Sequence, residues 1–298
     1  MTQSAPAPGL RALVFGTTGQ LGIELARRAP AGVAVTALGR ETADLSRPGT
    51  CAALISAMSA DVVINAAAYT AVDAAETDRE TAQLVNAEAP GAMARAAAAK
   101  GVPFLHVSTD YVFDGSGTRP WREDDPVAPL GAYGQTKLDG ERAIQAAGGP
   151  HVILRTAWVF SAHGKNFVKT MLRLGAERDT LGVVGDQRGG PTPAADIACT
   201  LWTIARAFRD GDGTSGIFHY AGAPTVSWAD FAEAVFDRSA LPKKPKVNRI
   251  ATSDYPTPAR RPANSALDCG RIHEAYGIAQ PDWRAGLGQV IDELETKV

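Results

Sequence analysis

Apolar segments and helical patterns alternate along the first half of the chain. The apolar segments are rich in β-branched side chains and fall at residues 11–15, 33–38, 61–65, 102–108 and 151–155. Between them, apolar positions recur at helical spacing, as in the alanine-rich stretch 82–100. Apolar strands of this kind are typical of parallel sheets that are covered by helices on both faces. The pattern therefore predicts an α/β fold with a doubly wound parallel sheet.

The pattern loosens after residue 155. Further helical patterns fall at residues 164–178, 194–209, 227–239 and 283–296. We expect a sheet domain over residues 10–155, which two later strands near 182–185 and 217–220 join. We expect residues 156–298 to form mainly a smaller, mostly helical lobe. Residues 1–9 follow no regular pattern and are predicted to be disordered.

Proline and glycine gather in two stretches of the second half. These are "GDQRGGPTP" at residues 185–193 and "SDYPTPARRPANS" at residues 253–265. Both stretches are too long, and too rich in proline and glycine, to be simple turns, so we interpret them as binding loops. For the second stretch, a proline-stiffened connector is the alternative that the residues alone favour.

Composition and charge exclude several classes of protein. The 298 residues carry a net charge of −2 with a pI near 6.2, which gives no electrostatic footprint for nucleic acid. No apolar stretch reaches the length of a membrane span, and the N-terminus lacks the pattern of a signal peptide. Cys51, Cys199 and Cys269 have no ligand spacing and are interpreted as packing residues. We therefore expect a cytoplasmic protein without nucleic-acid or membrane partners.

A glycine-rich turn follows the first predicted strand. The stretch "GTTGQLG" places Gly16, Gly19 and Gly22 at the start of a predicted helix. In such a turn, free backbone N–H groups and the positive end of the helix dipole point at an anion, as in the pyrophosphate site of Rossmann-type folds. The motif predicts a dinucleotide site, with a βα turn that binds no ligand as the alternative.

The end of the second predicted strand bears on the choice of cofactor. An acidic side chain there would bind the ribose 2′-hydroxyl, whereas an arginine would accept a 2′-phosphate. The strand ends in "LGR", so Arg40 favours NADPH, and the neighbouring Glu41 leaves NADH open. An ordinary surface role for Arg40 is the alternative.

The segment "YGQTKLDGE" places Tyr133 and Lys137 four residues apart. On a helix these side chains share a face, and a nearby ammonium lowers the pKa of a phenol. The strand before them ends in "HVSTDY", which puts the Thr109 hydroxyl at the carboxyl edge of the sheet, where parallel sheets bind ligands. We predict that Tyr133 is a general acid, assisted by Lys137 and Thr109. A strand-end cap is the alternative role for Thr109.

Glycine turn, strand-end threonine and YxxxK occur in the order seen in the extended short-chain dehydrogenase/reductase superfamily. Within it, residues 10–296 resemble the dTDP-4-dehydrorhamnose reductase family. The segments that carry this resemblance are "FGTTGQLG", "VINAAAYTAVDAAE", "HVSTDYVFDGSG", "PLGAYGQTKLDGE", "ILRTAWVF", "NFVKTMLRL", "DQRGGPTP" and "YPTPARRPANSAL".

The resemblance, the glycine turn and Arg40 together give a set of candidate site residues. The candidate cofactor contacts are Gly16, Thr18, Gly19, Gln20, Leu21, Arg40, Asp44, Leu45, Ala67, Ala68, Tyr69, Thr70, Val107, Tyr133 and Lys137. The candidate substrate contacts are Thr109, Asp110, Trp158, Asn166 and Arg261, with Arg260 as an alternative to the last. For Trp158, a role as a core or interlobe filler is the alternative.

The resemblance implies reduction of the 4-keto group of dTDP-4-dehydro-L-rhamnose, with a dTDP-sugar as partner. It also implies that a homodimer is an alternative to a monomer. Some members of the family are described as pairing through a Mg²⁺ ion held by carboxylates. The stretch "TPAADIA" offers only Asp196 for such a role, so Mg²⁺ stays open as a cofactor and we predict no metal ligand.

Two other functions remain open on the sequence. One is a nucleotide-sugar dehydratase or epimerase of the same superfamily. A dehydratase has Asp-Glu after the strand-end threonine, whereas Thr109 is followed by Asp110 and Tyr111. The other is a non-catalytic subunit similar to the regulatory subunit of methionine adenosyltransferase, against which Thr109, Tyr133 and Lys137 argue.

Overall fold

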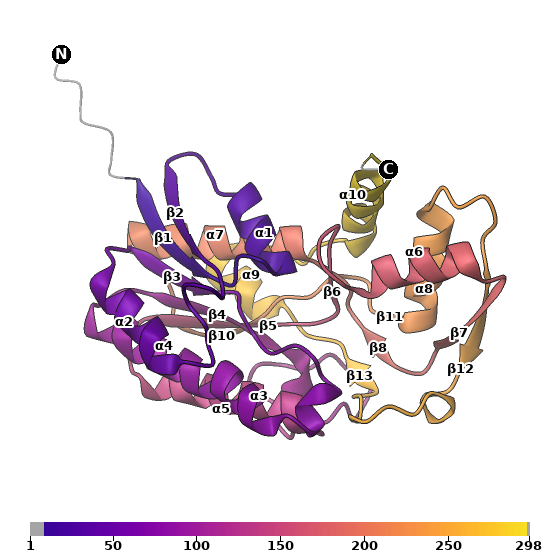
Figure 1. Ribbon diagram of the computed structural model, residues 1–298, viewed down its shortest axis with the longest axis horizontal. Helices are drawn as coiled ribbons and strands as arrows, with labels where there is room; N and C mark the ends of the chain where they lie inside the picture. Colours follow the sequence, from indigo (N-terminus) through magenta and orange to yellow (C-terminus); the bar gives the residue numbers. More distant parts are fainter. Residues whose placement is uncertain (1–8, 297–298) are drawn as a thin grey trace, which may run out of the picture.

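A six-stranded parallel sheet forms the core of the larger lobe (Figure 1). The computed structural model describes residues 9–296, so the predicted disorder of residues 1–8 lies outside the described residues. The strands run in the order β10-β5-β4-β3-β1-β2. Their bounds are β1 (Leu10–Phe15), β2 (Val33–Leu38), β3 (Val62–Asn65), β4 (Phe104–Thr109), β5 (His151–Thr156) and β10 (Gly216–His219). The predicted doubly wound parallel sheet is confirmed.

Side-chain alternation along the strands divides the core into two layers. In β1, Leu10, Ala12 and Val14 pack on one face of the sheet, and Leu13 and Phe15 pack on the other. The first face is covered by α1 (Gln20–Arg27), α7 (Ala194–Asp210) and α9 (Gly270–Tyr276). The second face is covered by α2 (Pro48–Ala57), α4 (Ala89–Ala99) and α5 (Ala132–Ala146). Both faces of the sheet are therefore buried.

Short elements connect β3 to α4 and β4 to α5. They are η1 (Ala74–Glu76), α3 (Arg79–Gln83), the π-helix η2 (Leu84–Glu88) and η3 (Asp110–Val112). A π-helical turn is rare and is often found at a functional site.

The smaller lobe has an apolar core of its own. Its helices are α6 (Phe167–Glu177), α8 (Trp228–Arg238) and α10 (Trp283–Thr296). Its extended segments are β6 (Val159–Phe160), β7 (Thr180–Val184), β8 (Arg188–Gly189), β9 (Thr192–Pro193), β11 (Val226–Ser227), β12 (Lys246–Ile250) and β13 (Asn264–Ser265), with the 3₁₀ turn η4 (Thr252–Asp254). The core is built around Phe231 and Trp283, whose rings lie 5.3 Å apart.

Two features differ from the predicted division of the chain. The strand expected near residues 182–185 does not join the main sheet, because β7 pairs with β12 in a separate ribbon. Exposed and buried residues alternate along β7, which suits a ribbon covered on one face only. In addition, α7 and α9 pack against the main sheet, although they lie beyond residue 155. The chain therefore crosses between the lobes several times.

No helix among the described residues combines the length and apolarity that crossing a bilayer requires. Cys51 and Cys269 are buried, but Cys199 is exposed on α7, so the interpretation as a packing residue is wrong for Cys199. It lies on the solvent side of an amphipathic helix whose other face packs on the sheet.

A buried ion pair ties α5 to the sheet. The Arg155 guanidinium donates to Glu141 through Nη2 at 2.6 Å and Nε at 3.0 Å, and both side chains are almost fully buried. The Ser108 hydroxyl on β4 donates to the same carboxylate at 2.5 Å. Such a pair is strongly destabilising when one partner is removed, since the other charge is left without compensation.

Glu141→Gln should therefore lower the free energy of unfolding by about 3–5 kcal/mol, because the Arg155 charge remains buried. Urea unfolding measures the change. The matched control is Glu177→Gln, which breaks the exposed pair with Arg173 and should change stability little. Equal effects of the two variants would contradict this account of the buried pair.

Candidate active site

A cleft of about 910 Å³ opens at the carboxyl edge of the main sheet. The turns after β1, β3, β4 and β5, the start of α5, and the loop before α6 line it. All the candidate cofactor residues contribute to this lining, as do four of the five candidate substrate residues. The structure thus brings nearly all of the predicted site residues together in one cleft.

The turn between β1 and α1 requires glycine, because neighbouring backbone atoms leave no room for a Cβ. Gly16 has a φ of +91°, and a Cβ there would lie 2.6 Å from the Ala67 nitrogen. A Cβ on Gly22 would lie 2.1 Å from the Gly16 oxygen. Gly19 is the N-cap of α1 and provides no side-chain cap, so the first helical turn faces the cleft with open N–H groups. This turn fits the phosphates of a dinucleotide.

Thr109 and Tyr133 lie together on the floor of the cleft. Thr109 is the last residue of β4, and Tyr133 stands in the first turn of α5, next to the ring of Tyr111 at 5.5 Å. Burial raises the pKa of Tyr133 to about 12, and the Asp110 charge raises it too, whereas the hydrogen bond with Thr109 opposes this shift. The phenol is therefore fully protonated at neutral pH.

Lys137 follows Tyr133 on α5 but bonds to β4. Its Nζ donates to the Val107 carbonyl at 2.6 Å and lies 3.1 Å from Nε2 of His106. Burial lowers the pKa of Lys137 to about 8, while the Glu141 charge raises it. The predicted lowering of the Tyr133 pKa by Lys137 is wrong for this arrangement, because the pKa of Tyr133 is raised and the amine turns toward β4.

Asp110 is a buried carboxyl group that faces the cleft. Its Oδ1 accepts a hydrogen bond from Thr109 at 3.1 Å, whereas its Oδ2 has no hydrogen-bond partner among the described residues. Burial raises the pKa of Asp110 to about 6. An unsatisfied buried acceptor is costly, and the nearby Ser265 hydroxyl offsets part of the rise in the Asp110 pKa.

A buried asparagine on the π-helix holds the loop after β3. Asn86 accepts a hydrogen bond from the Tyr69 nitrogen at 2.9 Å and donates to the Tyr69 carbonyl at 3.1 Å. It also donates to the Thr136 hydroxyl at 3.2 Å, and that hydroxyl donates to the Tyr133 carbonyl at 3.0 Å. Asn86 thus fixes the cofactor loop to the helix that carries Tyr133.

Two tryptophans form one wall of the cleft. Trp158 and Trp228 stack at 3.5 Å between ring centroids and 10° between planes. Trp158 has a φ of +48°, which is strained for a bulky side chain, and it packs against Gly189, where a Cβ would lie 2.5 Å from the ring. Trp158 thus lies in the cleft as predicted, but its ring is already stacked on a second indole.

Arg40, Asn166 and Arg261 differ in how they meet the cleft. The Arg40 side chain is 81 % exposed at the rim, 3.7 Å from Asp44. The Asn166 amide lines the cleft, but it caps α6 and donates to Gln20 at 2.9 Å. Arg261 does not line the cleft, because its guanidinium donates to Asp73 at 2.8 Å.

Comparison with known proteins places the chain in a family. Residues 10–296 match the model described as the RmlD substrate binding domain. A dTDP-4-dehydrorhamnose reductase from Burkholderia thailandensis is 46 % identical, with 96 % of this chain and 99 % of that protein covered. The chain belongs to the dTDP-4-dehydrorhamnose reductase family.

Two further relatives are similar to this chain over nearly their whole length. The crystal structure of dTDP-4-dehydrorhamnose reductase from Bacillus anthracis, in complex with NADP, matches with a TM-score of 0.89 and 30 % identity, covering 96 % of this chain and 99 % of that one. A probable dTDP-4,6-dihydroxy-2-methyloxan-3-one 4-ketoreductase from Streptomyces antibioticus is 38 % identical, with 96 % of each chain covered.

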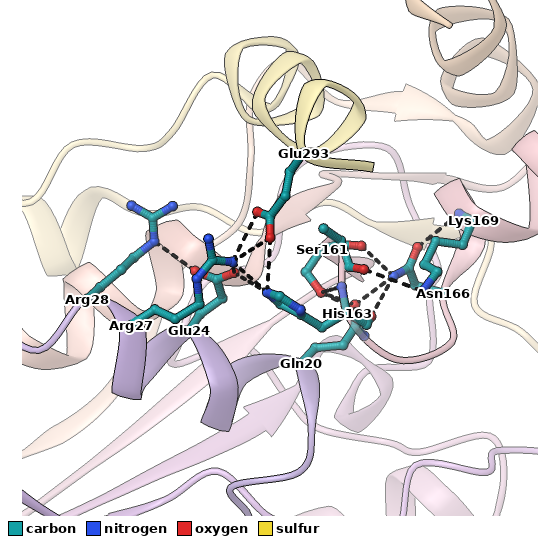
Figure 2. Close-up of polar contacts among 10 residues, drawn as sticks. Gln20, Glu24, Arg27, Arg28, Ser161, His163, Asn166, Lys169 and Glu293 are labelled. Atoms are coloured by element: carbon teal, nitrogen blue, oxygen red, sulfur yellow. Dashed lines mark hydrogen bonds and ion pairs between the residues drawn. The ribbon is translucent and has the colours of Figure 1, made fainter. Parts of the chain in front are cut away.

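Among the described residues, one group of possible metal ligands lies where α1, the loop before α6 and α10 meet. It comprises Glu24, His163 and Glu293, and Figure 2 shows the Arg27 side chain among them. Arg27 Nη1 lies 2.8 Å and 3.0 Å from the two Glu293 oxygens, 3.2 Å from Glu24 and 2.7 Å from His163. A guanidinium thus stands where a cation would bind, so these side chains do not fit Mg²⁺.

Sequence reasoning missed several cleft residues of this reductase family member, chiefly Tyr111, Lys165 and Trp228. Tyr111 directly follows Asp110, and Lys165 directly precedes Asn166, so the positions beside predicted contacts were a usable signal. Trp228 offered no such signal, because only the packing of α8 against β6 and α6 brings it to Trp158.

Asp110→Asn should make stability less dependent on pH. The pKa of Asp110 is raised to about 6 in the folded state against 3.8 as its reference value, so the folded wild type binds the extra proton between these limits. Wild-type stability should therefore fall as pH rises from 4 to 6, and the variant should lack that fall. The variant should gain roughly 1–3 kcal/mol on wild type between pH 4 and pH 7.

Urea unfolding of both proteins at each pH measures this difference. Asp212→Asn, at an exposed position after α7, is the control and should show no such trend. A difference between Asp110→Asn and wild type that is constant from pH 4 to pH 7 would rule out the buried, protonated carboxyl group.

Proposed function

We propose that this protein reduces the 4-keto group of dTDP-4-dehydro-L-rhamnose to the alcohol, with NADPH as the reductant. The observation that carries the proposal is the meeting of Thr109 and Tyr133 at the floor of a cleft that begins at the Gly16 turn. The reductases of the same family, and the NADP held by the Bacillus anthracis relative, support this choice of reaction and cofactor.

The residues of the cleft fit a nicotinamide dinucleotide. The open N–H groups at the start of α1 would hold the pyrophosphate, and Arg40 would meet a ribose 2′-phosphate at the rim. The loop fixed by Asn86 would flank the nicotinamide half together with Val107. When bound, the reduced nicotinamide supplies the hydride that attacks the sugar C4.

Tyr133 would then protonate the oxygen on C4. A developing alkoxide is more basic than a phenolate, so a phenol with a pKa of about 12 can donate to it. Thr109 would orient that oxygen, because its side chain lines the same cleft and acts on the Tyr133 phenol. Thr109 is buried and Tyr133 is partly buried, which limits the access of competing water to the transfer.

The rest of the cleft suits the sugar and its diphosphate. The free Oδ2 of Asp110 would accept a hydrogen bond from a sugar hydroxyl. The wall of Trp158 and Trp228 offers an apolar face, and Lys165 supplies a cation that lines the cleft where Arg261 does not.

The proposal is tested by mixing the purified protein with NADPH and enzymatically prepared dTDP-4-keto-6-deoxy sugar, while the nicotinamide absorbance is followed. A parallel assay uses the analogue without the sugar 2-hydroxyl, the type of substrate that the name of the Streptomyces antibioticus relative describes. Turnover of the 2-hydroxy sugar at the higher kcat/KM supports the proposal. Turnover of neither sugar would overturn it.

Tyr133→Phe should lower kcat by about 10² to 10⁴, since the general acid is lost while the ring and its packing remain. Cofactor binding, followed by the quenching of protein fluorescence, should stay near the wild-type value. Tyr276→Phe is the control, because that hydroxyl bonds to Thr214, far from the cleft. Near-normal turnover by Tyr133→Phe would exclude Tyr133 as the acid.

Arg40→Ala should lower kcat/KM with NADPH by roughly tenfold and leave kcat/KM with NADH almost unchanged, because only the former carries the 2′-phosphate. Steady-state rates with both cofactors measure the ratio. Arg122→Ala removes another largely exposed arginine, which lies outside the cleft, and serves as the control. An equal loss with both cofactors would show that Arg40 does not read the phosphate.

A further inference from the structure

A buried row of polar groups runs from the loop after β3 to Lys137. The Ala67 N–H donates to Oδ1 of Asn65 at 3.1 Å, and Nδ2 of Asn65 lies 3.0 Å from Nδ1 of His106. Nε2 of the same imidazole lies 3.1 Å from Nζ of Lys137. Asn65, His106 and Lys137 are all at most 1 % exposed, so water does not interrupt the row.

The hydrogens in this row can be assigned one after another. The Ala67 N–H needs an acceptor, which fixes Oδ1 of Asn65 on that side and turns the Nδ2 hydrogens toward His106. Nδ1 of His106 must therefore accept. Burial holds the pKa of His106 well below its ordinary value, so the ring is neutral and carries a single hydrogen. That hydrogen is on Nε2, which faces Lys137.

An N–H that faces the amine has a direct consequence for Lys137. An ammonium group has three donors and no acceptor, so it cannot accept the Nε2–H of His106. A neutral amine can accept it through its lone pair and still donate to the Val107 carbonyl at 2.6 Å. The row is thus fully satisfied only when Lys137 is uncharged.

We propose that Asn65 and His106 are positioning residues, which fix one imidazole tautomer and thereby favour the uncharged amine of Lys137 while the cleft holds no ligand. The role of Lys137 beside the general acid rests on the proposed function, but the tautomer does not. The charge that would pull a proton from Tyr133 is therefore disfavoured in the resting enzyme.

The other groups around Lys137 place the pKa of its amine not far above neutral pH. Burial lowers the pKa of Lys137 to about 8, and the Glu141 charge one turn along α5 opposes that shift. Arg155 on β5 neutralises most of the Glu141 charge through its paired hydrogen bonds. Tyr133, one turn back on α5, is an uncharged phenol at neutral pH. The Asp110 charge raises the pKa of that phenol. The Nε2–H of His106 then tips the amine further toward its uncharged form.

The first test is a measurement on the ligand-free wild-type protein, which needs no turnover. In protein labelled with ¹⁵N-histidine, long-range ¹H–¹⁵N correlation spectra distinguish a ring nitrogen with a hydrogen from one without. The signals of His106 are assigned by their absence in His106→Gln. We expect the hydrogen on Nε2 at pH 7–8. A hydrogen on Nδ1 would overturn the proposal, whether or not the protein reduces a sugar.

The second test reverses the tautomer. In Asn65→Asp both side-chain oxygens are acceptors, so Nδ1 of His106 becomes the donor and Nε2 turns its lone pair to Lys137. The pKa of Lys137 should rise by about one pH unit or more, as expected for one hydrogen bond to a charged group. The ¹³Cε signal of Lys137 in protein labelled with ¹³C-lysine, followed against pH and assigned with Lys137→Met, measures this value.

Asn248→Asp, on the exposed face of β12, adds the same charge far from the row and is the matched control. A pKa of Lys137 that is equal in wild type and Asn65→Asp would overturn the proposal. So would an equal rise in both aspartate variants. If the protein is a reductase, the pH profile of kcat/KM, which reports on the free enzyme, should shift with the lysine in Asn65→Asp only.

Discussion

The burial of polar side chains at the carboxyl edge of the main sheet is the constraint on which the rest of the site depends. Thr109, Asp110 and Lys137 are buried there, and Tyr133 is partly buried. Burial disfavours every charged form, so it raises the pKa values of Asp110 and Tyr133 and lowers that of Lys137. The identity of each hydrogen-bond partner then decides the chemistry, because bulk water cannot stand in for a missing one.

The sequence was sufficient for the sheet and for most of the cleft. Buried β-branched segments marked β1 to β5, because a strand covered on both faces must be apolar throughout. The glycine spacing marked the turn at Gly16, where backbone contacts admit no side chain. The strand-end position of Thr109 marked the floor. Each of these signals is local, so each could be read without knowing the fold.

Other features depend on contacts between distant segments, and local patterns did not reveal them. The position of β7 is set by its pairing with β12, some sixty residues later in the chain. The stack of Trp158 on Trp228 arises only when α8 packs beside β6. The amine of Lys137 turns to β4 because His106 and the Val107 carbonyl lie there, and a helical spacing from Tyr133 cannot indicate that direction.

The arginine-centred cluster of Figure 2 joins three parts of the chain that are far apart in sequence: α1, the loop before α6, and α10. Through Ser161 and Asn166 it continues to Gln20, which lies in the first turn of α1, next to the glycine turn. The glycine turn and the C-terminal helix are therefore braced by one continuous set of hydrogen bonds and ion pairs, although almost the whole chain separates them in sequence.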